Sequence, residues 1–311
     1  MTPASIRILN FDDSVARQEK LLAQYHPQVI DLRDVGPSAR LWASRKTKDE
    51  ISRRIPAPVK GQITFLGSGD FHHVSNILIE KLDEPLCVID FDFHPDWDIL
   101  APFLTCGSWV HRTLKNANVR KCVLIGIASD DMSSLWLPTG DLAALKDDRL
   151  EVYPYSHGPT RVFLKKVPDN ISIEVSRSLL SSTIQWNELK GKNLTEFFLH
   201  VIRRLPSKNV YISIDKDCLS HEYALTNWEE GRLSLDDLLH MLKLIKENLN
   251  IVGVDITGDY SKPRVKGFAR SLISKMDHPR NVKAKSLDDS MVTAVNEETN
   301  LKILKLLMPA G

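Results

Sequence analysis

Short apolar runs rich in β-branched residues recur along the chain, with longer polar stretches between them. Most runs are continuously apolar, which is typical of strands that are covered on both faces of a parallel sheet. Nine runs fit this description: residues 6–9, 29–32, 63–66, 86–91, 123–128, 150–155, 171–175, 210–214 and 251–256. This pattern predicts eight or nine strands.

The stretches between the runs carry helical patterns. Residues 70–83 place apolar side chains at helical spacing, and residues 234–248 begin with Ser234 as an expected N-cap. Alternation of strands and helices has few stable solutions. We therefore predict a three-layer α/β/α fold with right-handed crossovers and a mostly parallel central sheet of about eight strands.

The C-terminal part differs from the rest of the chain. Lys262, Arg264, Lys266 and Arg270 form a basic run that leads into a polar stretch without a clear period. We predict that residues 1–311 form a single domain, in which residues 261–311 are an extension that ends in a helix over residues 295–308. The same helix would also suit a contact between copies of the chain in a homo-oligomer.

The composition argues against some classes of binding partner. The chain has 41 Lys and Arg against 40 Asp and Glu, a net charge of +1, so it lacks the basic excess that nucleic acids and anionic membranes attract. Its apolar runs fall far short of the roughly 18 residues of a membrane helix, and no secretory signal is evident. Its four cysteines form no C-x-x-C pair. We predict a cytoplasmic protein that acts on a small molecule and has neither a nucleic acid nor a membrane as its partner.

Three of the runs end in unusual groups of ionisable residues. In a parallel sheet, ligands bind beyond the carboxyl ends of the strands, so polar residues that follow an apolar run are candidate site residues. The three segments are FLGSGDFHHVSN at residues 65–76, CVIDFDFHPDWD at residues 87–98 and VYISIDKDCLS at residues 210–220.

Alternate spacing within these segments favours a metal site. Side chains two apart on an extended chain point to the same side, so Asp92, His94 and Asp96 can converge, as can Asp215 and Asp217. Carboxylates gathered so closely repel one another unless a divalent cation lies between them. Imidazole and carboxylate donors without a thiolate favour Mn, Fe, Co or Zn, and the excess of oxygen donors favours Mn.

These segments resemble the motifs of the ureohydrolase superfamily, the arginase and agmatinase family of binuclear manganese enzymes. The family's G-G-D-H-S motif is similar to residues 67–73, D-A-H-x-D to residues 92–96, and S-x-D-x-D to residues 213–217. The resemblance covers roughly residues 60–260. It implies an arginase-like fold and two bound divalent metal ions, with Mn²⁺ as the expected metal.

The resemblance also implies a role for each residue. One ion would take His73, Asp92, Asp96 and Asp215, and the other Asp92, His94, Asp215 and Asp217. His73 is preferred to His72 because Val74 follows it and opens the helix, as in the family, although an extra residue precedes the pair. A hydroxide that bridges the two ions would attack the carbon of a C–N bond, and Asp96 would relay its proton.

Two positions depart from the family pattern. Gly258 stands where arginases carry the Glu that anchors the guanidinium group, with Asp259 beside it, and Cys106 replaces the family's His. The resemblance therefore implies a metal-dependent hydrolase of a small nitrogenous substrate that need not carry a guanidino group. Asp96, Asp259 and Cys106 are its candidate catalytic residues.

Three other functions remain open from the sequence. Residues 90–94 also resemble the D-x-D-x-H segment of histone-deacetylase-like enzymes, which would make the protein an amide deacetylase with one zinc ion. A pseudoenzyme that keeps only the metal cage is a second alternative, and a cavity plugged by Trp97 or Trp109 would favour it. A dinucleotide site at Gly67 and Gly69 is disfavoured, because the third glycine position of that motif is His72.

Overall fold

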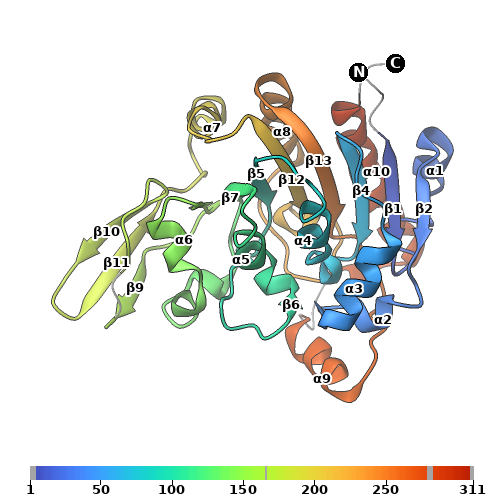
Figure 1. The fold of residues 1–311 in the computed structure, drawn as a ribbon, viewed down its shortest axis with the longest axis horizontal. Coiled ribbons are helices and arrows are strands. Elements are labelled where there is room, and N and C mark those ends of the chain that lie inside the picture. The colour runs from blue at the N-terminus through green and yellow to red at the C-terminus, as the bar shows by residue number, and fades with distance from the viewer. Residues whose placement is uncertain (1–4, 165–166, 279–282, 309–311) are drawn as a thin grey trace.

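Eight of the nine apolar runs form neighbouring strands of one central sheet. The computed structural model describes residues 5–164, 167–278 and 283–308. In spatial order the strands are β2 (Gln28–Asp31), β1 (Ile6–Asn10), β4 (Gln62–Gly67), β13 (Asn250–Thr257), β12 (Asn209–Asp215), β5 (Leu86–Phe91), β7 (Val119–Ile125) and β8 (Leu150–Tyr153). Each neighbouring pair is parallel. The predicted fold class is confirmed (Figure 1).

Helices cover both faces of the sheet because successive strand residues point to opposite sides. Ile89 and Phe91 belong to one buried cluster, whereas Val88 belongs to another. The cluster of Ile89 includes side chains of α1 (Glu19–Tyr25), α7 (Leu194–Arg203), α8 (Leu235–Asn248) and α10 (Asp289–Leu307). The cluster of Val88 includes side chains of α3 (Arg45–Arg54), α4 (Val74–Ile79), α5 (Trp109–Thr113) and α6 (Leu142–Lys146).

The strand order reverses at two places, and these reversals position the functional residues. From β1 the chain passes through α1 to β2 and then returns through α3 to β4, on the other side of β1. From β5 it passes through α5 to β7 and later returns through α7 to β12, on the other side of β5. At such switch points the connections leave on opposite faces, so a crevice opens at the carboxyl ends of the strands.

The ninth apolar run lies outside the central sheet. Residues 171–175 overlap β10 (Ile173–Arg177), which forms an antiparallel sheet with β11 (Ser181–Trp186) and β9 (Thr160–Phe163). In β9, buried and exposed residues alternate, which is typical of a sheet with one solvated face. This small sheet stands at the left in Figure 1, beyond α6.

The C-terminal segment contains more helix than its sequence suggested. Residues predicted as loop form α9 (Phe268–Asp277), and the closing helix α10 begins at Asp289, six residues before the predicted start. Residues 279–282 and 309–311 of the predicted extension lie outside the described residues. Short elements complete the fold: α2 (Gly36–Ala39), β3 (Trp42–Ala43) and β6 (Leu104–Thr105). None of the helices that the structure describes has the length and apolar character of a bilayer-spanning segment.

Candidate metal centre

The candidate site lies at the switch point between β5 and β12. β5 ends at Phe91 and is followed directly by Asp92, while Asp215 is the last residue of β12. A 3-10 turn after β12 holds Asp217, and a second one after β4 leads to His72. The carboxyl ends of three strands thus bring together the residues that the three sequence segments supplied.

One group of side chains surrounds the imidazole of His72. Its Nδ1 lies 3.1 Å from Asp92 Oδ2, 3.3 Å from Asp96 Oδ2 and 3.6 Å from Asp215 Oδ2. On the other side of the ring, Nε2 lies 2.8 Å from Ser213 Oγ, a hydrogen bond that fixes the ring orientation. Nδ1 therefore points at three carboxylates.

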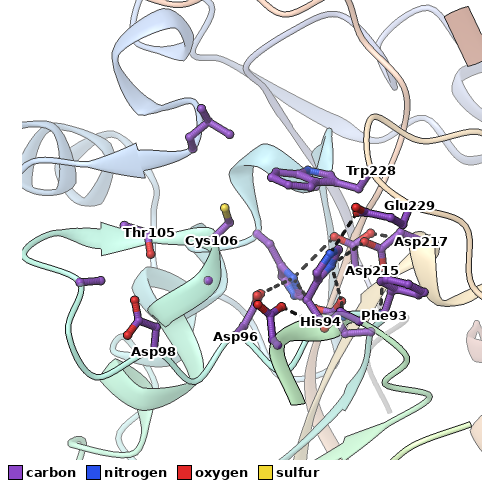
Figure 2. Close-up of a pocket in the computed structure, with 18 of the residues that line it drawn as sticks. Phe93, His94, Asp96, Asp98, Thr105, Cys106, Asp215, Asp217, Trp228 and Glu229 are labelled. Carbon is purple, nitrogen blue, oxygen red and sulfur yellow. Dashed lines mark hydrogen bonds and ion pairs between the residues drawn. The ribbon is translucent and has the colours of Figure 1, made fainter. Parts of the chain in front are cut away.

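A second group surrounds the imidazole of His94. Its Nδ1 lies 3.1 Å from Asp217 Oδ2 and 3.6 Å from Asp92 Oδ1 (Figure 2). Asp92 therefore turns one carboxylate oxygen toward each histidine. Among the described residues, the two groups that could each hold a metal ion are His72, Asp92 and Asp96, and Asp92, His94 and Asp217. Asp92 is common to both.

The donor atoms fit divalent cations. Asp92 Oδ2 and Asp217 Oδ2 are buried, and neither accepts a hydrogen bond from any residue in the described part of the chain. An ionised oxygen buried without a partner is costly, and a bound cation removes that cost. Two imidazole nitrogens with four carboxylates and no thiolate form a donor set that suits Mn²⁺ and similar ions.

Burial and mutual repulsion raise the pKa values of Asp96, Asp215 and Asp217, whereas the two histidines lower that of Asp92. Burial, together with the Asp92 charge, raises the pKa of Asp96 to about 7 and that of Asp217 to about 6. Burial opposes protonation of His72, but the carboxylates of Asp92 and Asp96 outweigh it and hold its pKa well above the usual range. Without metal, the cluster therefore retains protons near neutral pH, and a metal ion must displace them.

We expect the affinity for Mn²⁺ to rise with pH between about 5 and 8. Below pH 6, Asp217 and Asp96 carry protons that compete with the ion, and above pH 7 both are ionised. The dissociation constant should fall by up to about tenfold per pH unit for each proton displaced. Equilibrium dialysis with Mn²⁺ at a series of pH values measures this, and an affinity that does not change across the range would show that the ion does not compete with these protons.

The predicted ligand His73 lies outside the cluster, and His72 takes its place. Neither ring nitrogen of His73 hydrogen-bonds to any described residue, and burial, with the Arg270 charge, lowers its pKa to about 3. The 3-10 turn at Gly69–Phe71 runs directly into α4. Because successive residues of a helical turn point about 100° apart, only one histidine of the pair can face the strand ends.

The candidate catalytic residue Asp259 serves a structural ion pair instead. Its side chain is buried, with Oδ2 2.9 Å from Lys216 Nζ, and Oδ1 accepts a hydrogen bond of 2.6 Å from Gln18 Nε2. It does not line the cavity above the metal cluster. The sequence placed Asp259 in the site because it stands beside Gly258, the position of the family's Glu, but its side chain contacts Lys216 and Gln18 instead.

Gly258 explains why no anchoring Glu stands at this position. Its φ is +89°, and a Cβ atom there would lie 2.5 Å from Asp215 Oδ1 and 2.7 Å from the Lys216 backbone nitrogen. A side chain at position 258 would therefore collide with a residue of the cluster. The backbone at Gly258 therefore leaves no room for the Glu of the family pattern.

A cavity of about 720 Å³ opens above the cluster. Cys106 lies on its wall, with Thr105 and Asp98 on the same side in Figure 2. The lining also includes the acidic residues Asp130, Asp131 and Glu229 and the aromatic residues Trp42, Phe93, Phe103 and Trp228. Among the described residues that line it there is no Lys or Arg, so its charged lining residues other than the two histidines are all acidic.

Neither Trp97 nor Trp109 plugs this cavity. Both are buried in the core, at 2% and 0% exposure, and neither contributes to the cavity wall. Trp109 instead donates a hydrogen bond of 2.8 Å from Nε1 to Asp96 Oδ2. This bond fixes Asp96, whose φ of +46° is uncommon outside glycine and is often found at functional sites.

The sequence analysis missed Trp228 and Glu229. Glu229 Oε2 lies 3.3 Å from His94 Nε2, and the Trp228 ring meets the His94 ring edge-on at 5.5 Å (Figure 2). Asp70 fixes Trp228 by accepting a hydrogen bond of 3.0 Å from its Nε1. The segment 227–233 resembles a family motif, which could have directed attention to both residues.

A family model described as the arginase family matches residues 164–258, the stretch that contains β12 and Asp215 and Asp217. Over these residues the chain is similar to the arginase family. An uncharacterized protein of Thermotoga maritima is 27% identical over 259 residues, which cover 83% of this chain and 81% of that protein.

Solved structures of the family share its fold. The arginase of Entamoeba histolytica, solved in complex with L-ornithine, superposes with a TM-score of 0.56 and 11% identity over 98% of this chain and 97% of that one. The formimidoylglutamase of Bacillus subtilis gives a TM-score of 0.52 and 14% identity over 95% and 87% of the two chains.

Proposed function

We propose that this protein is a hydrolase that uses two divalent metal ions, most readily Mn²⁺, to cleave a C–N bond of a small nitrogenous compound. The observation that carries the proposal is Asp92, which turns one carboxylate oxygen toward each of two histidine and carboxylate groups. These groups lie at the base of an open cavity of about 720 Å³. Shared carboxylates of this kind are suited to two-ion sites.

Different residues of the chain have different roles in the proposed reaction. When bound, two such ions supply a water-derived nucleophile at neutral pH and polarise the substrate. Asp96 would hold and transfer the proton, because its carboxylate lies beside His72 and Asp92 in one of the two ligand groups. The hydrogen bond from Trp109 keeps Asp96 in place during this transfer.

The lining of the cavity supports a cationic substrate without a carboxylate group. Asp98, Asp130, Asp131 and Glu229 line it, while no Lys or Arg among the described lining residues could pair with a substrate carboxylate. Aromatic rings on the wall can also attract a cation. We therefore favour a substrate that carries an amine remote from the C–N bond that is cleaved.

A matched set of substrates tests this proposal. Guanidino, formimino and amide compounds that end in an amine would be compared with the same compounds ending in a carboxylate, using the Mn-loaded protein. We expect hydrolysis in the amine series, with kcat/KM at least about tenfold above that of the acid series. Preference for the acid series would refute the assigned substrate charge, and no hydrolysis by protein that holds two ions would refute the activity.

We further propose that Glu229 contacts the nitrogen of the substrate in place of the missing Glu at position 258. It lies beside His94 on the cavity wall, outside the two ligand groups. Glu229→Gln should lower kcat/KM by about 10- to 100-fold and leave two ions bound, because it removes a charged partner of the substrate. Glu230→Gln is the matched control, since Glu230 pairs with His221 on the surface. Equal kinetics in both variants would remove Glu229 from the site.

A further inference from the structure

The other switch point of the sheet, between β1 and β4, also holds a cavity. It encloses about 330 Å³ and is separate from the cavity above the metal cluster. Its wall includes Phe11 and Asp12 after β1, Phe71 after β4 and Tyr260 after β13. The fold therefore provides two crevices of the kind in which open α/β sheets bind ligands, and the metal cluster accounts for only one of them.

The charge of this second cavity is the opposite of the first. Five cationic side chains line it, Arg17, Arg33, Arg40, Lys262 and Arg264, against three aspartates, Asp12, Asp13 and Asp289. Two of the aspartates are already paired, because Arg33 Nη1 lies 3.4 Å from Asp13 Oδ1 and Lys262 Nζ lies 3.0 Å from Asp289 Oδ2. Of the remaining three arginines, Arg40 pairs with Asp70, so Arg17 and Arg264 are the two without an ion-pair partner among the described residues.

Asp12 is itself occupied by other donors. Its Oδ1 accepts a hydrogen bond of 2.6 Å from Ser14 Oγ, and its Oδ2 accepts one of 2.6 Å from Ser261 Oγ. The backbone nitrogen of Ser68 donates to the same Oδ2 at 3.2 Å. These bonds occupy both oxygens of Asp12, which forms no ion pair with Arg17 or Arg264.

Arg40 forms a fixed base for the cavity. Its side chain is 1% exposed, Nε lies 2.5 Å from Asp70 Oδ2, Nη2 lies 2.6 Å from Ser261 Oγ, and the guanidinium lies over the Phe71 ring. Nη1 donates to no described residue. A buried guanidinium that is held in place and retains an unused donor is preorganised to bind an oxyanion.

Arg17 and Arg264 also have unused hydrogen-bond donors. Arg17 is exposed and makes one hydrogen bond, from Nη2 to the Tyr260 carbonyl oxygen at 3.3 Å. Arg264 is exposed and makes neither a hydrogen bond nor an ion pair with any residue in the described ranges. Arg17 and Arg264 can therefore turn toward an anion that sits on Arg40.

We propose that this cavity binds the phosphate group of a small molecule, either inorganic phosphate or a phosphomonoester. Arg17 and Arg264 supply two unpaired positive charges for a doubly charged phosphate, and Arg40 adds a fixed planar donor. The volume of the cavity is at the lower end of the range for small-molecule sites, which excludes bulky ligands. The proposal does not depend on the hydrolytic activity.

Calorimetric titration with inorganic phosphate tests the proposal in the full chain, first as isolated and then after dialysis against a chelator. A site that persists after dialysis does not depend on metal ions. We expect one saturable site, weakened at least about tenfold when Arg17→Gln and Arg264→Gln are combined. Glycerol phosphate is titrated in parallel, and the ligand that binds more tightly identifies the source of the phosphate group.

Arg203→Gln is the control for loss of a surface arginine, because it removes one positive charge from an exposed position on α7. Its phosphate affinity should stay within about twofold of the unsubstituted chain. Three results would overturn the proposal: absence of a saturable site, an affinity unchanged in the double variant, or an equal loss in the Arg203 variant.

Discussion

Asp92→Asn should abolish binding of both metal ions and reduce any hydrolytic activity by about three orders of magnitude. Asp92 is the residue whose two oxygens face different histidines, at 3.1 Å from His72 Nδ1 and 3.6 Å from His94 Nδ1. Loss of its charge removes a donor from both ligand groups at once. Because outer-shell changes alone weaken metal binding by about 10- to 100-fold, loss of a shared ligand should weaken it further. Metal analysis after dialysis and a hydrolysis assay measure the two effects.

Asp90→Asn is the matched control for this experiment. Asp90 lies two residues earlier on β5 and is equally buried, but it belongs to neither ligand group. Burial raises the pKa of Asp90 well above the usual range, and Asn has nearly the same shape without the ionisable group. The Asp90 variant should keep two ions. Retention of both ions by the Asp92 variant would contradict the shared-ligand arrangement.

Gly258→Ala should lower both stability and metal affinity. The added Cβ would lie 2.5 Å from Asp215 Oδ1, a distance that real Cβ atoms essentially never show, so Asp215 must move away from the cluster. The positive φ adds backbone strain. We expect a loss of about 2–4 kcal/mol in the free energy of unfolding and a weaker affinity for Mn²⁺. Denaturant titration and equilibrium dialysis measure the two quantities.

Gly191→Ala distinguishes the effect of backbone strain from that of the steric clash with Asp215. Gly191 has a similar φ of +80°, but a Cβ atom there would have no neighbour within 4 Å. This variant should show only the cost of the backbone conformation, about 1 kcal/mol, with unchanged metal binding. If the two variants lost equal stability and both kept their ions, contact between position 258 and Asp215 would not matter.

The sequence predicted the central sheet well because its strands are buried on both faces. Continuous apolar runs such as residues 86–91 and 251–256 mark such strands directly. Of the small antiparallel sheet only β10 overlaps a predicted strand, and β9, β11 and α9 were missed for the opposite reason. Residues of β9 alternate between buried and exposed positions, and Phe268 in α9 is largely exposed, so neither segment shows a continuous buried run.

The site could be predicted only as far as local spacing determines it. Asp92, His94 and Asp96 follow one strand at alternate positions, so their convergence is a local property of the chain. The choice between His72 and His73 depends on how a 3-10 turn joins α4, which spacing does not specify. Asp259 turns toward Lys216 for a similar reason, because the direction of a side chain after a strand depends on its tertiary partners.

The cavity wall depends on contacts between distant segments, which a single sequence does not reveal. Glu229 meets His94 across 135 positions of the chain, and Trp228 is fixed by Asp70, which lies 158 positions away. Such residues become candidates only once the fold has brought them together.

The metal content of the purified protein tests the central claim most directly. Protein produced with added Mn²⁺ and then dialysed would be analysed for metal per chain, beside the Asp92→Asn variant. The arrangement of His72, Asp92, His94 and Asp217 predicts two equivalents in the unsubstituted chain and none in the variant. One equivalent in the unsubstituted chain, or two in the variant, would contradict a two-ion centre that shares Asp92.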